Sequence, residues 1–378
     1  MKEIAHRENV TRRKLLKGGA IAAGATMAST LAAPAVVGQS PTVVKMQTSW
    51  PASDIWMDFA RQYVTRVEQM SGGRLKIDLL PAGAVVGAFQ VLDAVNDGVL
   101  DAAHTVPVYW YGKHKAASLF GTGPVFGGSA TTMLAWFHNG GGEALYQELT
   151  QKILGLKVYG FFGFPMPAQP FGWFKNPITK VSELKGFKYR TVGLAADLMQ
   201  RLGMSVAQLP GGEIVPAMER GVIDAFEFNN PSSDMRFGAQ DVAKNYMLSS
   251  YHQASESFEF LFNKDFFDDL PKDQQAILKY TVEAVSTSNT SLAFDQYSAD
   301  LKKLQAGGVA VHRTSKEILD AQLKAWDALI PELEKDPYMK KVIDSQKAWV
   351  ERVVFYELMN APDLALAYDH YFPGKLKL

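Results

Sequence analysis

The fold of this chain is indicated by a short segment that occurs twice, as LDAVNDGVLDA at residues 92–102 and as VPAMERGVIDA at residues 215–225. Both copies follow a Leu-Pro pair and a glycine, at residues 80–83 and 209–211. The positions that match without a gap are Ala94 and Ala217, Gly98 and Gly221, Val99 and Val222, Asp101 and Asp224, and Ala102 and Ala225.

Each copy predicts a strand, a Pro/Gly turn, a short helix, a glycine that ends the helix, and a second strand. Apolar residues recur with helical spacing before Gly98 and Gly221, and glycine readily adopts the left-handed conformation that ends a helix. A unit of this type occurring twice predicts two similar α/β lobes, an arrangement suited to closing on a small ligand. Chance similarity between two strand–helix units is the alternative.

The N-terminus predicts export. Residues 11–17, TRRKLLK, form a twin-arginine motif, and the weakly apolar residues 18–31 follow it. Ala33-Pro34-Ala35 offers small residues for cleavage, so residues 1–35 are predicted to be a twin-arginine signal peptide. A membrane anchor is the alternative, but the segment is poor in large apolar side chains.

Composition narrows the functional classes. About 340 of the 378 residues would remain after cleavage, enough for two domains with their own cores. The formal net charge is zero, which gives no electrostatic argument for nucleic acid or an anionic membrane. The chain has no cysteine, which excludes disulfides, thiolate metal sites and cysteine nucleophiles. No segment after the signal is apolar enough to span a bilayer.

The remaining chain alternates between predicted strands and helices and then becomes mostly helical. Strands are predicted at residues 42–48, 75–80, 157–164 and 187–192, and helices at 54–70 and 194–202. Residues 271–304 lack internal Pro and Gly and predict one very long helix. A second helical region is predicted from 315 to about 358, with a break near Pro337.

Catalytic motifs are absent from the sequence. It contains no HExxH pair, no G-x-S-x-G elbow and no P-loop. The glycine-rich residues 121–127 miss the dinucleotide-binding spacing. His104 is more easily explained as a hydrogen-bonded structural histidine than as a base. These absences favour a binding protein over an enzyme, although an exported enzyme with an unrecognised site stays an alternative.

Two clusters suggest ligand recognition. Tyr109-Trp110-Tyr111 is too aromatic for a solvated loop, and either core packing between lobes or a pocket wall would explain it. Residues 187–193 form a predicted strand that delivers Arg190 just before a glycine and a helix start. Ligands of open α/β sheets bind beyond the carboxyl ends of strands, and the arginine fork fits a carboxylate. A structural salt bridge is the alternative for Arg190.

The chain resembles the DctP-type substrate-binding proteins of TRAP transporters over nearly its whole mature length. The resemblance is closest to the branch that binds 2-oxo acids or lactate with a cation. It rests on residues 185–190, 217–227 and 261–264 with the long helix after them, on His104-Thr105-Val106, on the aromatic residues 109–113, and on Gln169 ahead of Gly172-Trp173-Phe174.

The resemblance implies an α/β, two-lobed periplasmic binding protein-like fold with a long lobe-spanning helix and a helical C-terminal region. Lobe 1 would comprise residues 41–165 plus about 255–310. Lobe 2 would comprise residues 166–254 plus part of the C-terminal region, and residues 311–378 would form that helical region.

The resemblance also implies a binding site. Arg190 would bind the ligand carboxylate, while Gln169, the Glu227 side chain and the Phe228 carbonyl would surround a cation that touches the ligand. Gln253 stands where related proteins can carry a glutamate, so a monovalent ion is easier to justify than a divalent one unless Glu256 compensates. The expected cation is therefore Na⁺ or Ca²⁺. A lobe-interface carboxylate bonded to backbone is the alternative for Glu227. The pocket lining is predicted to comprise Arg190, Gln169, Tyr109, Trp110, Tyr111, Trp50 and Phe228.

The expected function is a periplasmic receptor that delivers a small organic acid to the small and large integral membrane subunits of a TRAP permease. A receptor that feeds a sensor is an alternative. A homodimer is predicted through the helical C-terminal region, with packing on the chain's own lobes as the alternative. The apolar residues behind this prediction are Trp326, Leu329, Ile330 and Leu333, followed by Trp349, Val353, Tyr356 and Leu358.

Overall fold

The structure is a computed structural model that describes residues 40–376. The predicted signal peptide, residues 1–35, lies outside the described residues. Within residues 40–376 no helix is both long enough and apolar enough to cross a bilayer.

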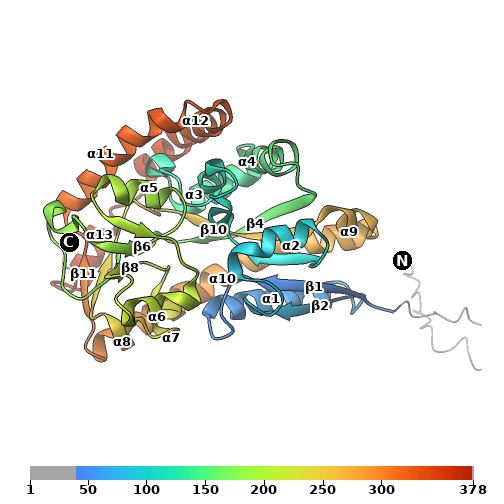
Figure 1. The fold of residues 1–378 in the computed structure, drawn as a ribbon, viewed down its shortest axis with the longest axis horizontal. Helices are drawn as coiled ribbons and strands as arrows, with labels where there is room; N and C mark the ends of the chain where they lie inside the picture. The colour runs from blue at the N-terminus through green and yellow to red at the C-terminus, as the bar shows by residue number, and fades with distance from the viewer. Residues whose placement is uncertain (1–39, 377–378) are drawn as a thin grey trace, which may run out of the picture. The chain divides into compact units, whose positions relative to one another are not determined.

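The described chain contains two β-sheets (Figure 1). The first has the strand order β2-β1-β3-β10-β4. Strand β1 is parallel to β2 and β3, whereas β10 is antiparallel to β3 and β4. Its strands are β1 (Thr42–Thr48), β2 (Leu75–Leu80), β3 (Ala102–Thr105), β4 (Val158–Met166) and β10 (Glu256–Asn263).

The second sheet has the order β11-β9-β5-β8-β6-β7. Strand β6 is parallel to β7 and β8, and β5 runs antiparallel to its neighbours. Its strands are β5 (Gly172–Phe174), β6 (Lys188–Arg190), β7 (Ser205–Ala207), β8 (Ala225–Phe226), β9 (Asn245–Leu248) and β11 (Ala310–Arg313). Each sheet with its helices forms one lobe, so the predicted two-lobed α/β fold is confirmed; the lobe boundaries stay a prediction.

The repeated segment has the same structure in both lobes. Helices α2 (Val91–Asn96) and α6 (Ile214–Glu219) each end before a glycine with positive φ, 72° at Gly98 and 68° at Gly221. The repeated aspartates make equivalent hydrogen bonds. Asp101 Oδ2 accepts from the Lys45 amide at 2.8 Å, and Asp224 Oδ2 accepts from the Lys188 amide at 3.1 Å. Both aspartates therefore tie the second strand of the unit to its central neighbour.

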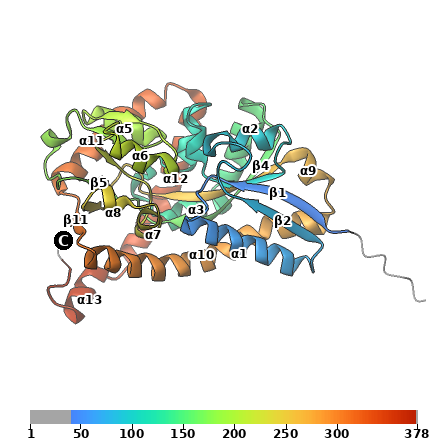
Figure 2. The ribbon, with the colours of Figure 1, turned by 60° about the horizontal axis from the view of Figure 1, so that its bottom comes forward.

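The predicted long helix connects the lobes. It extends slightly further than predicted, as α10 (Lys272–Ala306), and runs along one side of the described chain (Figure 2). Its first half packs on the first lobe, where Leu278 O accepts from Tyr63 of α1 (Ile55–Met70) at 2.8 Å. Its second half reaches the second lobe, where Asp300 accepts from Ser232 at 2.6 Å.

The other helices cover the two sheets. In the first lobe they are α3 (Ala130–Asn139), α4 (Gly142–Gln147), α9 (Lys264–Asp269) and the 3₁₀ segments η2 (Ala88–Gln90), η3 (Pro107–Trp110), η4 (Lys115–Phe120) and η5 (Val125–Gly127), with a π-helical turn η6 (Glu148–Ile153) after α4. In the second lobe they are η7 (Val181–Leu184), α5 (Leu194–Arg201), η8 (Gly211–Glu213), α7 (Pro231–Arg236) and α8 (Ala239–Val242).

The C-terminal region contains α11 (Lys316–Leu333), α12 (Pro337–Asn360) and α13 (Leu364–Tyr371), and the predicted break falls before Pro337. The prediction that Trp326, Leu329 and Leu333 contribute to a dimer surface was wrong, because all three are buried in the chain's own core. The packing alternative holds there because Trp326 Nε1 also donates to Tyr251 O at 2.8 Å. A finding that the sequence did not predict is β11, which pairs with β9 immediately after α10.

Asp101→Ala should lower the free energy of unfolding by about 1–3 kcal/mol, because it leaves the Lys45 amide of a central strand without its acceptor. Asp224→Ala should cost less, since its hydrogen bond is longer and more exposed. Urea denaturation of both variants, with exposed Asp97→Ala as control, would measure the effect. An Asp101→Ala protein as stable as the control would remove the register role of this aspartate.

Candidate functional site

The candidate site lies where the strands of both lobes end and the chain crosses between them. Arg190 ends β6 and Glu227 follows β8, which is the parallel neighbour of β6. Trp50 and Tyr109 follow the parallel strands β1 and β3 of the first lobe. Side chains of both lobes therefore meet beyond the carboxyl ends of their strands, as in other open α/β sheets.

Arg190 and Glu227 form a buried ion pair, and neither side chain is more than 1% exposed. Arg190 Nη1 donates to Glu227 Oε1 and to the Glu227 carbonyl, both at 2.8 Å, and Nε donates to Leu209 O at 2.8 Å. The salt bridge considered as the alternative for Arg190 is therefore present. Within the described chain, these bonds leave the two N–H groups of Nη2 available to a further acceptor.

The two segments that cross between the lobes contribute the remaining polar groups. Gln169 lies between β4 and β5, and Gln253 lies between β9 and β10. Their backbones are joined by a bond from Gln169 N to Gln253 O at 3.0 Å. Glu256 begins β10, and its Oε2 accepts from Gln169 Nε2 at 2.9 Å. Both crossing segments therefore run beside the site.

Burial raises the pKa of both carboxyls in this cluster. The pKa of Glu227 rises to about 7, although the Arg190 charge opposes the effect of burial. The pKa of Glu256 rises to about 8, first because of burial and next because the charge of Glu227 acts on it. The two carboxylates are thus within electrostatic reach of each other.

The donor set of the cluster fits a hard cation. Among residues 40–376, the buried side-chain oxygens without a hydrogen-bond partner include Gln169 Oε1, Glu227 Oε2, Gln253 Oε1 and Glu256 Oε1. Amide and carboxylate oxygens are the ligands of sodium and calcium, whereas zinc and copper favour nitrogen or sulfur. In the same range, no three or more His, Cys, Asp or Glu residues come together as a metal site. The amide oxygens are therefore essential to any cation site here.

The aromatic residues predicted to line the pocket separate into two groups. Tyr109 is within the field of Arg190, Glu227 and Glu256, and burial raises its pKa well above the ordinary value. Trp50 packs beside it, with ring centroids 6.2 Å apart. Phe228 lies under Arg190, with the guanidinium carbon 5.6 Å from its ring centroid. These three border the polar cluster.

The other two aromatic residues of the run have different partners. Trp110 Nε1 donates to Glu259 Oε2 at 2.9 Å within the core of the first lobe. Tyr111 donates to Asp197 of α5 at 2.9 Å, so it links the lobes away from the charged cluster. The structure therefore brings Tyr109 to the cluster and places Trp110 and Tyr111 elsewhere.

His104 is a structural histidine in this arrangement. Trp50 Nε1 donates to His104 Nδ1 at 2.8 Å, and burial lowers the pKa of His104 to about 3. The neutral ring accepts a hydrogen bond from the indole N–H and so fixes the orientation of Trp50. His104 thus positions a wall of the candidate pocket.

The repeated unit explains why the two lobes contribute differently. The register pairs Gln47 with Ala103 in the first lobe and Arg190 with Phe226 in the second, so Gln47 occupies the place of Arg190. Gln47 accepts from the Val85 amide at 2.8 Å in the loop after β2, as Arg190 binds the Leu209 carbonyl after β7. Sequence reasoning missed Gln47 because it lies outside the matched residues 92–102, and only the strand register shows that it is the counterpart of Arg190.

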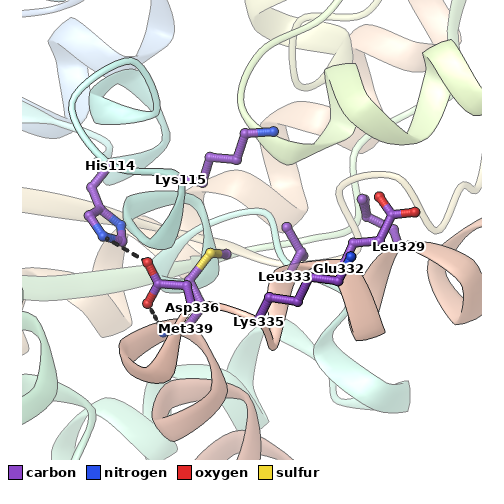
Figure 3. A pocket seen from close by; sticks show the side chains of 8 residues that line it. All are labelled: His114, Lys115, Leu329, Glu332, Leu333, Lys335, Asp336 and Met339. Atoms are coloured by element: carbon purple, nitrogen blue, oxygen red, sulfur yellow. Dashed lines mark hydrogen bonds and ion pairs between the residues drawn. The ribbon is translucent and has the colours of Figure 1, made fainter.

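A surface depression elsewhere on the described chain is a weaker candidate for a ligand site. It has a volume of about 560 Å³ and lies between η4 and the junction of α11 and α12 (Figure 3). Most of its charged groups already have partners: His114 faces Asp336 at 3.5 Å, Lys115 pairs with Asp197 at 2.8 Å, and Glu332 pairs with Arg201. The buried cluster offers more unsatisfied polar atoms and is the better candidate.

A sequence model of the family DctP, described as bacterial extracellular solute-binding protein, family 7, matches residues 46–336. The chain belongs to this family. A curated relative of this family 7 protein is the monocarboxylate 2-oxoacid-binding periplasmic protein of Nostoc sp. (strain PCC 7120 / SAG 25.82 / UTEX 2576). The two are 36% identical over 333 residues, covering 86% of this chain and 88% of the relative.

Solved structures of TRAP solute-binding proteins share the fold of this family 7 protein. One from Bordetella bronchiseptica RB50, a mixed-occupancy dimer with copurified calcium and picolinate, has a TM-score of 0.81 and 29% identity over 88% of this chain and 97% of that chain. Another, from Pseudoalteromonas atlantica T6c with bound sodium and pyruvate, has a TM-score of 0.79 and 28% identity over 89% of this chain and 100% of that chain.

Arg190→Ala should weaken binding of a small monocarboxylate by ~2–5 kcal/mol, or roughly one and a half to three and a half decades, because a buried charge loses its partner. Arg190→Lys should also bind poorly, since one ammonium cannot hold Leu209, Glu227 and a ligand together. Calorimetric titration with pyruvate as probe would measure this, and exposed Lys188→Ala is the control. A loss of less than about threefold, relative to the decades expected, would move Arg190 out of the site.

Proposed function

We propose that this chain is the periplasmic solute-binding subunit of a TRAP-type secondary transporter. It binds a small 2-oxo or 2-hydroxy monocarboxylate together with a cation and delivers it to the small and large membrane subunits of the permease. The observation that carries this proposal is the buried Arg190–Glu227 pair, which leaves Glu227 Oε2 without a partner in the described chain; the side-chain oxygens of Gln169 and Gln253 are also without one. The 2-oxoacid-binding relative and the pyruvate-bound structure support the ligand class.

Each group has a separate role in binding. Arg190 Nη2 donates to the ligand carboxylate, which also approaches the cation held by Gln169, Glu227 and the Phe228 carbonyl. A bound cation supplies a strong contact that a small ligand could not otherwise make. Trp50, Tyr109 and Phe228 exclude water around these charges, which strengthens the electrostatic interactions.

Binding is coupled to the approach of the two lobes. In the structure Asp54 of the first lobe accepts from Ser233 of the second at 2.7 Å, and Trp56 packs on Phe228 with ring centroids 5.3 Å apart. A ligand that contacts both lobes stabilises this closed arrangement, and the crossing segments supply the hinge.

The chain reaches the periplasm in folded form through the twin-arginine pathway, as the motif at residues 11–17 predicts. The ligand is bound reversibly and leaves unchanged. Incubation of stripped protein with pyruvate, followed by chromatography of the released compound, distinguishes a receptor from an enzyme. A receptor that feeds a sensor would bind equally well but would give no uptake with a permease.

Binding should require a cation. Protein dialysed against chelator in low-sodium potassium buffer should bind pyruvate weakly. Pyruvate binding should recover when calcium or sodium is restored, because the free oxygens of Glu227 and Gln169 then have a cation to bind. Glu227→Gln should resemble the stripped protein. Thermal shift reports the change, since a ligand that binds only the native state raises the melting temperature. Equal binding in metal-free potassium buffer would exclude the cation bridge.

The C-terminal helices form a homodimer interface. Large apolar side chains are more than half exposed along the end of α12 and along α13, and α13 buries none of its residues. Exposed apolar surface of this extent marks an interaction site. A second copy of this chain is the partner that fits, in line with the dimeric Bordetella bronchiseptica structure. The residues are Phe355, Tyr356, Leu358, Met359, Leu364, Leu366, Tyr371 and Phe372.

Sedimentation velocity at micromolar concentration should show a dimer for the wild-type chain. Leu358→Asp with Leu366→Asp should shift it to monomer, because two charges would be buried at the interface. Leu323→Asp, an exposed leucine on α11, is the matched control and should stay dimeric. A monomeric wild-type protein would remove the dimer proposal and leave the ligand-binding proposal intact.

A further inference from the structure

The first turn of α5 makes a contact between the lobes that lies outside the ligand contacts proposed above. Helix α5 packs on β7 and α11, on the side of the second lobe. Asp197 in its first turn nevertheless binds two side chains of the first lobe. Tyr111 donates to Asp197 Oδ1 at 2.9 Å and to Oδ2 at 3.0 Å, and Lys115 Nζ donates to Oδ2 at 2.8 Å. Both oxygens of this carboxylate are therefore bound from the opposite lobe.

This cluster is more than an exposed surface pair. Lys115 points away from Asp336 at the junction of α11 and α12 (Figure 3), and its ammonium lies 5.4 Å from the centroid of the Tyr111 ring. The Asp197 side chain is only 17% exposed, although that of Lys115 is 49% exposed. Hydrogen bonds to a charged group are stronger than neutral ones, and burial of the acceptor reduces screening by water. The three side chains can therefore hold the two lobes together.

The start of α5 also approaches the first lobe more closely than a residue with a side chain would allow. Gly193 precedes the helix with a φ of 65°, and the Leu194 amide donates to Ser118 Oγ at 3.3 Å. A Cβ atom at Gly193 would lie 2.2 Å from Val108 Cγ2 and 2.7 Å from Ser118 Oγ, and both of these atoms belong to the first lobe. This arrangement of the lobes is therefore possible only because residue 193 is glycine.

The same end of α5 is tied to the strand that carries Arg190. Arg190 ends β6, and only Thr191 and Val192 separate it from Gly193. Both connecting residues are buried, so the strand end and the helix start move as one unit. A movement of the second lobe that brings Arg190 to a ligand therefore also brings α5 to the first lobe.

We propose that Tyr111, Lys115 and Asp197 form an interlobe latch that holds the lobes closed and sets how long the ligand stays bound. This inference rests on the proposed function, because it takes Arg190 as the residue that binds the ligand. The latch acts without touching the ligand, and Gly193 lets it engage. A contact that forms only after the lobes close slows dissociation of the ligand and leaves association nearly unchanged.

Stopped-flow tryptophan fluorescence of the mature protein, with pyruvate as probe and calcium and sodium present, measures both rate constants. Asp197→Ala should raise the dissociation rate constant about five- to tenfold and change the association rate constant less than about twofold. Tyr111→Phe and Lys115→Met should each raise the dissociation rate constant about two- to fivefold. In the Asp197→Ala background Tyr111→Phe should add little, because the partner of the phenol is already gone.

Arg201→Gln is the matched control. Arg201 is also on α5 and also forms an ion pair, but its partner Glu332 is on α11, which packs on the same lobe. Both rate constants of this variant should equal those of the wild type.

A second pair of variants tests the close approach at Gly193. Gly193→Ala should weaken pyruvate binding at least about tenfold, because the added methyl group meets Val108 and holds the lobes apart. An alanine at this positive φ is also strained within the second lobe. Val108→Ala in the same protein removes the obstruction between the lobes but leaves that strain. It should therefore restore most of the affinity.

Unchanged dissociation in folded Asp197→Ala, Tyr111→Phe and Lys115→Met would overturn the latch, as would an equal rise in Arg201→Gln. If Asp197→Ala does not fold, the two variants of the first lobe decide the question. Gly193→Ala that Val108→Ala does not rescue would overturn the role of Gly193. These results leave the proposed function intact as long as wild-type protein binds pyruvate. Wild-type protein that does not respond to pyruvate would contradict the proposed function, and the latch with it.

Discussion

The buried pair between Arg190 and Glu227 is the interaction on which the site depends. A buried ion pair is costly unless its remaining donors and acceptors are satisfied. Arg190 meets this condition only in part, because Nε and Nη1 bind the Leu209 and Glu227 carbonyls and the guanidinium lies over the ring of Phe228. The unused N–H groups and the free Glu227 oxygen are then suited to a carboxylate and a cation. The buried pair therefore has unused polar groups that a charged ligand could satisfy.

The location of this pair follows from the duplicated unit. Asp101 and Asp224 fix equivalent strand registers, and these registers make Gln47 the counterpart of Arg190. Both side chains bind the loop after the neighbouring strand, but only the second lobe carries a charge there. The first lobe instead presents Trp50 and Tyr109. The two lobes thus share this unit but differ at the candidate site, where the second lobe carries Arg190 and the first carries aromatic side chains.

Local periodicity predicted most of the elements, because the repeat, α10 and the C-terminal helices depend on short-range patterns. The direction of individual side chains was less predictable. Tyr109, Trp110 and Tyr111 face three environments because the chain turns through η3, and no sequence spacing encodes that turn. The sequence left open whether Glu256 compensates for Gln253 as a cation ligand, because the position of Glu256 depends on where β10 begins. Strand β11 was missed since four residues show little alternation.

In the proposed function, the crossing segments would link ligand binding to the arrangement of the lobes, because they carry polar residues of the candidate site. Gln169 and Gln253 come from these segments, Glu256 begins β10 directly after the second segment, and Glu227 follows β8 in the second lobe. In the proposed site, a cation held by Gln169 and Glu227 would connect a crossing segment to the second lobe, and the ligand would add contacts to the first. A ligand shifts a conformational equilibrium only by its differential affinity for the two states. The bond from Gln169 N to Gln253 O holds the two crossing segments side by side, so a cation bound by oxygens of both segments would also stabilise this arrangement of the lobes.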